Sequence, residues 1–254
     1  MSQAADSAGI PFDGREFRPH PFDGDDGSCP DALAAALELW VKDPTGEAMA
    51  AVINALRTER VLVPLLAEAG EFGLTDEGKV VDKTQELSIV SVEGPDGKPV
   101  AVAFSDVESM RAWNPQARPI PVEAQKVAAW VLDDQMARIV LNPGSPTQCV
   151  VRRGGVIALL TGESYTPPWL DGDVVGGITQ AFEDVETVTV SPGWHLHGGN
   201  GPDLSVEVTL PAGLTHVQLQ QRQEHWARVW ASNETVNQRV DGLHLKLVTT
   251  PPSQ

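Results

Sequence analysis

Cysteine is scarce in this chain: Cys29 and Cys149 are the only two among 254 residues. Cys29 stands in a polar N-terminal stretch and Cys149 in a predicted strand, and such a pair does not make a disulfide framework. The simpler interpretation is a protein of a reducing compartment, so we expect it in the cytoplasm.

Positively charged residues are also few. Lys and Arg together number 18 against 35 Asp and Glu, which gives a formal net charge of −17 at pH 7. Binding to nucleic acid depends on clustered Lys and Arg that neutralise phosphates. We therefore expect no nucleic-acid partner, and the acidic excess also disfavours an anionic membrane surface.

Long hydrophobic runs are missing as well. No segment approaches the roughly 20 consecutive apolar residues that a spanning helix requires. The first thirty residues lack a basic start followed by an apolar core, the pattern of a secretion signal. We expect no membrane partner.

The common catalytic motifs are absent too. The sequence contains neither G-x-x-x-x-G-K-[ST] nor a G-x-G-x-x-G placed between a strand and a helix, and no G-x-S-x-G surrounds Ser145. Cys149 lies between Gln148 and Val150 in a predicted strand, where cysteine usually acts as a small hydrophobic residue. We expect no catalytic residue and no cofactor, although the absence of motifs leaves the question of an enzyme open.

Composition divides the chain into three parts. Residues 1–30 are rich in Gly, Pro, Asp and Ser, and are predicted to form a flexible leader because they have few apolar side chains to bury. Residues 31–153 are expected to form one α+β domain, a mixed sheet with helices. Residues 155–250 are expected to form a smaller α+β domain.

Apolar spacing predicts the elements of the first domain. A first helix is expected from Asp31, where apolar residues recur at helical spacing, and a second is expected after a cap at Asp43, with Pro44 as its first residue. Two more helices are expected, one from Ser105 to near Trp113 and one from Pro121. Strands are expected at Arg60–Leu66, Glu86–Glu93, Lys98–Phe104, Arg138–Asn142 and Gln148–Arg152.

The second domain has its own order of elements. The pattern predicts a strand at Val156–Leu160, a helix near Val174–Phe182, strands at Glu186–Ser191 and Leu204–Leu210, a helix at Thr215–Trp230 and a last strand around Leu245. Strand, helix, strand, strand, helix, strand is the order of a split βαβ, or ferredoxin-like, unit.

Two loops are candidate binding sites. In the first, Asn142-Pro143-Gly144-Ser145 is expected to form a tight turn that leaves backbone donors and acceptors free at a strand end, and a turn with a purely structural role is the alternative. In the second, Trp113 and Asn114 lie at a helix end beside a proline-restricted loop. An exposed Trp there would be an interaction anchor, and a Trp that closes the apolar face of its helix is the alternative.

The segment from Trp194 to Asp203 is the weak candidate for a metal site. In an extended chain His195 and His197 point to the same face, and Asp203 adds a carboxylate. Two ligands and one nearby carboxylate do not complete a site, so a polar loop between two strands is the alternative, and we assign no metal.

Three short segments carry a family resemblance. R-I-V-L-N-P-G-S-P at 138–146, P-F-D-G-D-D-G-S at 21–28 and R-V-L-V-P-L at 60–65 resemble the SseB family of bacterial proteins. That family is named for a serine-sensitivity phenotype and has no agreed biochemical activity. The resemblance implies an N-terminal SseB-like domain followed by a second domain, and it implies no reaction.

Three functional hypotheses follow. The first is a non-catalytic cytosolic binding or adaptor protein that engages another protein through Trp113–Pro121 and Leu141–Pro146. The second is a small-molecule sensor or enzyme related to amino-acid metabolism, with Asn142 in its site. The third is a metal protein that uses His195 and His197. The oligomeric state and the identity of the partner stay open.

Overall fold

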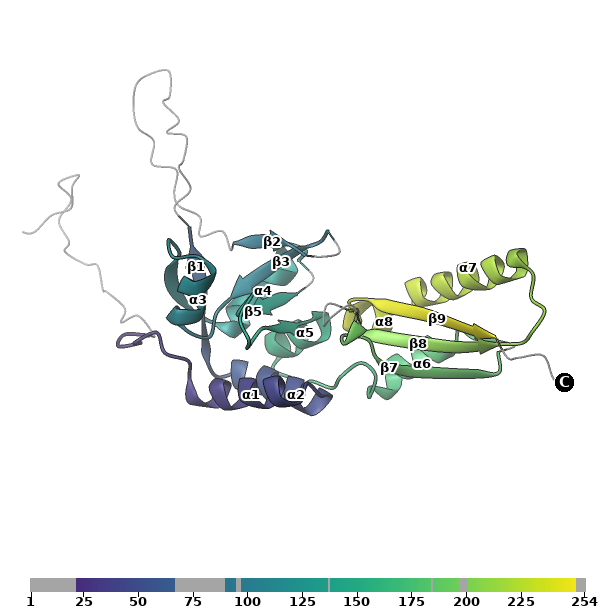
Figure 1. Ribbon diagram of the computed structural model, residues 1–254, viewed down its shortest axis with the longest axis horizontal. Helices are drawn as coiled ribbons and strands as arrows, with labels where there is room; N and C mark the ends of the chain where they lie inside the picture. The colour runs from purple at the N-terminus through teal and green to yellow at the C-terminus, as the bar shows by residue number, and fades with distance from the viewer. Residues whose placement is uncertain are drawn as a thin grey trace, which may run out of the picture.

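The computed structural model describes residues 22–66, 90–94, 97–136, 138–183, 185–196 and 201–249. The molecule is elongated, with two halves that lie one after the other (Figure 1), and each half has its own large hydrophobic core. The first gathers buried side chains from Leu33 to Leu159, and the second gathers them from Val174 to Val236. Helices and mixed sheets occur in both halves, so the predicted α+β class is confirmed.

Two helices open the first half. Helix α1 (Asp31–Lys42) buries Leu33, Ala36 and Leu37, as its apolar spacing predicts. Helix α2 (Gly46–Leu56) begins later than predicted, because Thr45, and not Asp43, caps it. The Thr45 hydroxyl accepts a 3.2 Å hydrogen bond from Ala48 N, which satisfies one of the free donors at the helix start.

The strands of the first half form two small sheets. Strands β2 (Ser91–Glu93), β3 (Pro99–Ala103), β5 (Ile139–Leu141) and β6 (Cys149–Val151) lie in that order. Strands β3 and β5 are parallel and the other pairs antiparallel, so this sheet is mixed, as predicted. Of the predicted strand Glu86–Glu93 and its turn, residues 86–89 and 95–96 lie outside the described ranges.

The second small sheet corrects one prediction. Strand β1 (Arg60–Leu65) pairs antiparallel with β4 (Arg118–Glu123), so Pro121 lies in a strand and does not open a helix. Prolines are tolerated there because β4 is an edge strand of this pair, where a missing N–H costs no ladder bond. Helix α4 (Ala124–Asp133) starts where the prolines end.

Two further helices complete this half. Helix α3 (Val107–Trp113) is capped by Asp106, and not by Ser105 as predicted. Helix α5 (Arg153–Thr161) occupies the stretch predicted as the strand Val156–Leu160, so that prediction was wrong. A short apolar run does not reveal its periodicity, whereas Gly162, at φ 75°, ends the segment as a left-handed helix cap.

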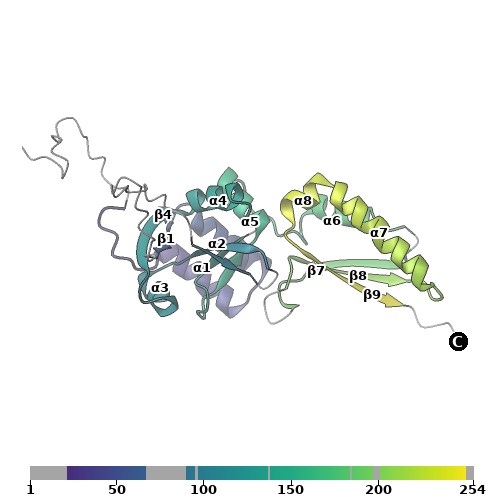
Figure 2. The same ribbon diagram turned by 90° about the horizontal axis from the view of Figure 1, so that it is seen from above.

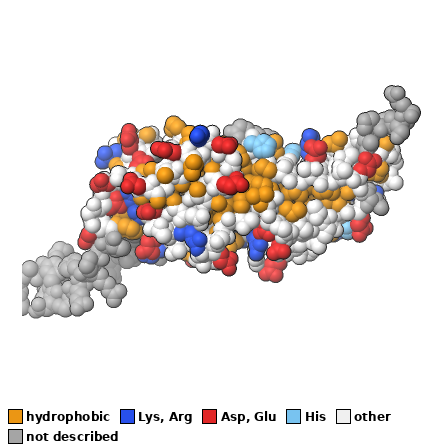
Figure 3. Space-filling view, turned by 90° about the horizontal axis from the view of Figure 1, so that it is seen from below, with side chains coloured by type: hydrophobic (Ala, Val, Ile, Leu, Met, Phe, Trp, Pro, Cys, Tyr) orange, Lys and Arg blue, Asp and Glu red, His pale blue; other side chains and the backbone are white. Residues whose placement is uncertain are grey.

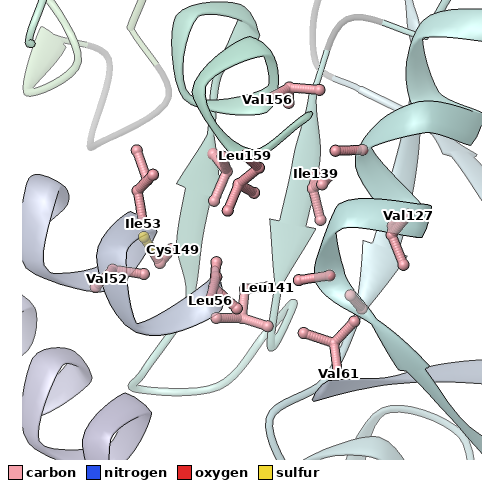
Figure 4. Close-up of a cluster of buried hydrophobic side chains, with 14 of the residues drawn as sticks. Val52, Ile53, Leu56, Val61, Val127, Ile139, Leu141, Cys149, Val156 and Leu159 are labelled. Carbon is pink, nitrogen blue, oxygen red and sulfur yellow. The ribbon is translucent and has the colours of Figure 1, made fainter. Parts of the chain in front are cut away.

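The first core lies between these helices and the sheet. Figure 4 shows side chains from α2, α4 and α5 converging on those of β5 and β6. Val156 and Leu159 of α5 are fully buried in this cluster. Helix α5 therefore belongs to the first core, although it follows the predicted domain boundary in the sequence.

The second half has three strands. Strand β7 (Thr187–Pro192) pairs antiparallel with β8 (Leu204–Leu210), and β9 (Leu243–Thr249) pairs parallel with β8. Helices α6 (Gly172–Thr179), α7 (His216–Ser232) and α8 (Glu234–Arg239) cover one face of this sheet (Figure 2). The expected ferredoxin-like order holds from its first helix onward, but α5 stands where its first strand was predicted.

Residues 22–30, predicted to be part of a flexible leader, are fastened to the first half. The buried Arg60 side chain donates to both Asp25 carboxylate oxygens and to Ser28 O, and Val107 N donates to Gly27 O at 2.9 Å. Residues 1–21 lie outside the described ranges. None of the helices that the structure describes has the length and apolar character needed to cross a membrane.

Candidate functional site

The main candidate site is a hollow of about 350 Å³ where the two halves meet. Its walls carry four aromatic side chains and two prolines, and we call it the aromatic pocket: Trp40, Tyr165, Trp169, Trp194, Pro44 and Pro146. These residues come from the end of α1, the loop before α2, the β5–β6 turn, the link before α6 and the loop after β7. The fold therefore assembles the pocket from both halves.

Specific contacts fix the tryptophans. Trp40 Nε1 donates a 3.0 Å hydrogen bond to the backbone oxygen of Gln148. The rings of Trp40 and Trp194 are 5.5 Å apart between centroids and tilted by 51°. Trp169 packs on the start of α2, where a Cβ added to Gly46 would lie 3.2 Å from its ring. Glycine at that position permits the link to approach the first half closely.

The floor of the aromatic pocket is a buried ion network. Arg152 Nε lies 3.3 Å from Asp203 Oδ1, and Arg152 Nη1 lies 3.4 Å from Asp241 Oδ2. Arg138 Nε lies 2.9 Å from the same Asp241 oxygen. The other Asp203 oxygen accepts a 2.6 Å hydrogen bond from Asp241 N. The network therefore joins the residue after β6 and the residue before β5 to the segments that lead into β8 and β9.

The charges of this floor are matched within the network. Arg152 Nη2 donates to Gly201 O, so all three of its guanidinium nitrogens contact oxygen atoms of the protein. Burial raises the pKa of the Asp203 carboxyl to about 6, against the opposing effect of Arg152. The aromatic pocket consequently has apolar walls above a floor whose charges are already paired.

A second, larger hollow lies beside the first. It measures about 1290 Å³ and runs between α1 and α3, and we call it the α1–α3 groove. Glu38 of α1 and Glu108 of α3 line its two sides, and Ser145 and Pro146 line its end. Pro146 also lines the aromatic pocket, so the two hollows share a wall at the β5–β6 turn.

The predicted turn site at Asn142 turns out to hold this shared wall in place. Asn142 is fully buried, and its backbone has φ 51°. Its side-chain oxygen accepts from Ser105 N at 2.8 Å, and its amide nitrogen donates to Ser105 Oγ and Thr147 Oγ1. The amide is therefore occupied inside the protein. Pro143, Gly144 and Ser145 follow it on the surface of the turn.

The predicted anchor at Trp113 is half-buried. Its ring centroid lies 5.4 Å from that of Phe104, and it packs on a small cluster that includes Met110. Asn114 ends α3, and its side chain accepts a 2.9 Å hydrogen bond from Gln116 N. The contacts favour the alternative in which Trp113 closes the apolar face of its helix.

The predicted metal ligands do not gather in the described part of the chain. His195 is exposed and Asp203 is buried in the ion network, while His197 lies outside the described ranges. Among the residues described, no three His, Cys, Asp or Glu side chains lie together as a metal site would require. Cys149 is buried beside Met49, and burial raises its thiol pKa to about 12, which makes it a poor nucleophile.

Sequence reasoning missed the aromatic pocket because its tryptophans are far apart in the chain. Trp40 falls within the apolar pattern of the helix predicted from Asp31, and no role is predicted for Trp169 or Trp194. A signal was present: Trp169 follows Pro167-Pro168, and Trp194 follows Pro192-Gly193. A tryptophan in a rigid loop is more often exposed to a ligand than one in a helix or strand, because loops lie at the surface.

Comparison with known proteins agrees with the resemblance seen in the sequence. The model of the SseB protein N-terminal domain matches residues 33–158, a range that begins in α1 and ends within α5. No curated protein and no solved structure matches the chain significantly. The match covers the first core and its helices, and on this ground the chain belongs to the SseB family.

Proposed function

We propose that this protein is a non-catalytic binding protein of the cytosol whose aromatic pocket holds part of an extended segment of another protein. The observation that carries the proposal is the gathering of Trp40, Trp169 and Trp194 around a floor whose charges are already paired. Buried aromatic anchors of this kind supply most of the energy at protein interfaces.

The surroundings of the aromatic pocket support a protein partner. Figure 3 shows a band of hydrophobic side chains across the middle of the face that carries α1 and α2. Val41, which lines the aromatic pocket, is 50% exposed, and Leu39 and Leu170, the chain neighbours of Trp40 and Trp169, are 54% and 59% exposed. Exposed apolar side chains that gather around a hollow are typical of interaction sites.

A free amino acid fits this site less well. It carries both a carboxylate and an ammonium group, and each needs an oppositely charged or hydrogen-bonding partner when it is buried. Arg152, whose side chain lines the aromatic pocket, already contacts oxygen atoms with each guanidinium nitrogen. Asn142, the residue on which the sensor hypothesis relied, is occupied by Ser105 and Thr147.

The experiment selects binders from a displayed library of random peptides of about twelve residues, long enough to cross both hollows in an extended form. Wild type, Trp194→Ala and the control Val217→Ala are immobilised separately. Val217 is 62% exposed on α7, away from the aromatic pocket. Thermal melting first establishes that both variants are folded.

We expect peptides enriched on wild type to bind Val217→Ala equally and Trp194→Ala at least about tenfold more weakly, a loss of about 1.4 kcal/mol. A selection that enriches no peptide on wild type contradicts the proposal. Equal binding to Trp194→Ala contradicts it as well, since the peptides would then bind elsewhere.

A further inference from the structure

We propose that the bound segment is an extended peptide with a proline in the aromatic pocket and Lys or Arg side chains in the α1–α3 groove. This inference rests on the proposed function and adds the chemistry of the partner to it. Three features carry it: indole N–H groups that donate to no acceptor among the described residues, a groove that shares a wall with the pocket, and an acidic lining.

The aromatic pocket suits proline better than a polar side chain. Tilted rings over a charge-paired floor present flat apolar faces, as do the grooves that bind polyproline II peptides. Trp40 Nε1 donates to a backbone oxygen, whereas the Nε1 groups of Trp169 and Trp194 donate to no acceptor in the described ranges. A polyproline II segment makes no internal hydrogen bonds, so its carbonyl oxygens can accept from them.

The two hollows can be occupied by one short segment. Helix α1 borders both of them, with Glu38 on the groove side and Val41 on the pocket side. These residues are three positions apart, which is about one helical turn or 5 Å along the axis. An extended chain covers about 3 Å per residue, so a few residues of ligand pass from the pocket into the groove over Pro146.

The lining of the α1–α3 groove determines which charge suits the part of the bound peptide that lies outside the aromatic pocket. Glu38 and Glu108 are exposed on opposite walls, and Asp26 adds a third exposed carboxylate. Asp106 also lines the groove but already caps α3, and among the described residues Arg111 is the one Lys or Arg side chain in the lining. Figure 3 shows acidic side chains beside the hydrophobic band on this half. The lining is complementary to a basic segment.

The test uses the same displayed library on three folded proteins. The double variant Glu38→Lys/Glu108→Lys reverses the charge of both groove walls. The control Asp133→Lys/Asp134→Lys makes the same change in net charge at the exposed end of α4, outside both hollows. The enriched peptides are sequenced for each protein, and their affinities are measured at low and at physiological salt.

We expect wild type and the α4 control to enrich peptides that contain proline followed or preceded within a few residues by Lys or Arg. The groove variant should retain the preference for proline, lose the preference for Lys and Arg, and bind the selected basic peptides at least about tenfold more weakly at low salt.

Two results overturn the inference. Proline enrichment on wild type without Lys or Arg refutes the basic partner while leaving the aromatic pocket as a binding site. Enrichment of pocket-dependent peptides that lack proline refutes the polyproline occupant in the same way. A wild-type selection that enriches nothing refutes the proposed function itself, so the two failures are distinguishable.

Discussion

Trp40 Nε1 donates a 3.0 Å hydrogen bond to the backbone oxygen of Gln148, which lies 108 positions further along the chain. The Gln148 side chain in turn accepts from Gly144 N at 2.8 Å, so the end of α1 and the β5–β6 turn are joined through one residue. This connection fixes one wall of the aromatic pocket before any ligand binds, and a pre-formed wall reduces the entropy lost on binding.

Replacing Asn142 with Ala should destabilise the protein by about 3 kcal/mol, because buried Ser105 N loses its acceptor and Ala tolerates a positive φ poorly. The control Asn114→Ala removes a contact to an exposed backbone N–H and should cost about 0.5 kcal/mol. Urea denaturation of both variants measures the two free energies. Equal losses would show that Asn142 does not fasten the turn.

The stability contributed by Asp203 should depend on pH. Burial raises its folded-state pKa to about 6, above the ordinary 3.8, so the folded protein holds this proton more tightly than the unfolded chain. Its contribution is then fully present below the ordinary pKa and is lost as the pH rises through about 6.

In Asp203→Asn this loss is absent, so the stability of the variant relative to wild type should rise by up to about 3 kcal/mol between about pH 4 and about pH 7. Urea denaturation at a series of pH values gives the difference in the free energy of unfolding between variant and wild type. The contributions of Asp25 and the other carboxylates shared by both proteins cancel in this difference. A relative stability that falls with pH would mean that pairing with Arg152 outweighs burial.

Two neighbouring glycines of α6 should respond in opposite directions to alanine. A Cβ at Gly176 meets no atom within 4 Å, so Gly176→Ala should stabilise the protein by about 0.5–1 kcal/mol through helix propensity. A Cβ at Gly177 would lie 2.7 Å from Asn233 Nδ2 and 3.0 Å from Val236, so Gly177→Ala should cost about 1–3 kcal/mol.

Asn233 has little freedom to move away, because its side chain caps α8. Thermal melting of the two alanine variants is sufficient for the comparison. A stabilising effect of Gly177→Ala would contradict the close packing of α6 against α8.

Arg60→Lys should loosen residues 25–29. A guanidinium reaches Asp25, Ser28 and Ser105 together, whereas a single ammonium cannot span the same acceptors. We expect a loss of about 2 kcal/mol, together with faster hydrogen exchange at the amides of residues 25–29. Arg118→Lys, an exposed change on β4, should leave both measurements unchanged. Unaltered exchange in Arg60→Lys would refute the fastening role.

Hydrogen bonding to Arg60 also lowers the pKa of the Asp25 carboxyl. Asp25 therefore contributes stability above its ordinary pKa of 3.8, and this contribution is lost as the pH falls through the lower folded-state value. The difference in the free energy of unfolding between wild type and Asp25→Asn should therefore become smaller as the pH falls. Urea denaturation near and below about pH 4 checks the direction.

The periodicity of apolar residues was enough to predict the elements with a long and regular pattern. Strand β8 alternates from Leu204 to Leu210 with the buried side chains that its sequence predicts. Helix α7 begins one residue after the predicted start at Thr215, which caps it. These patterns are local, because the period of a strand or helix is set by its own backbone geometry.

Where the local pattern was short, packing decided the structure. The run from Val156 to Leu160 suits a buried strand or a buried helix, and its fit against Ile53 at Gly155 places it in α5. Pro121 suits a helix start by itself, but β4 forms because β1 offers it an antiparallel partner. Both outcomes depend on contacts with residues that are distant in the sequence.

The sequence by itself determined the α+β class, the acidic composition and the turn at Asn142, because composition, alternation and the Asn-Pro-Gly signal can be read without the tertiary structure. Only the tertiary structure decided that Trp40, Trp169 and Trp194 line one pocket and that Arg152 and Asp203 pair beneath it. These residues lie on separate segments of the two halves, and their proximity follows from how the two cores pack together, which no local pattern encodes.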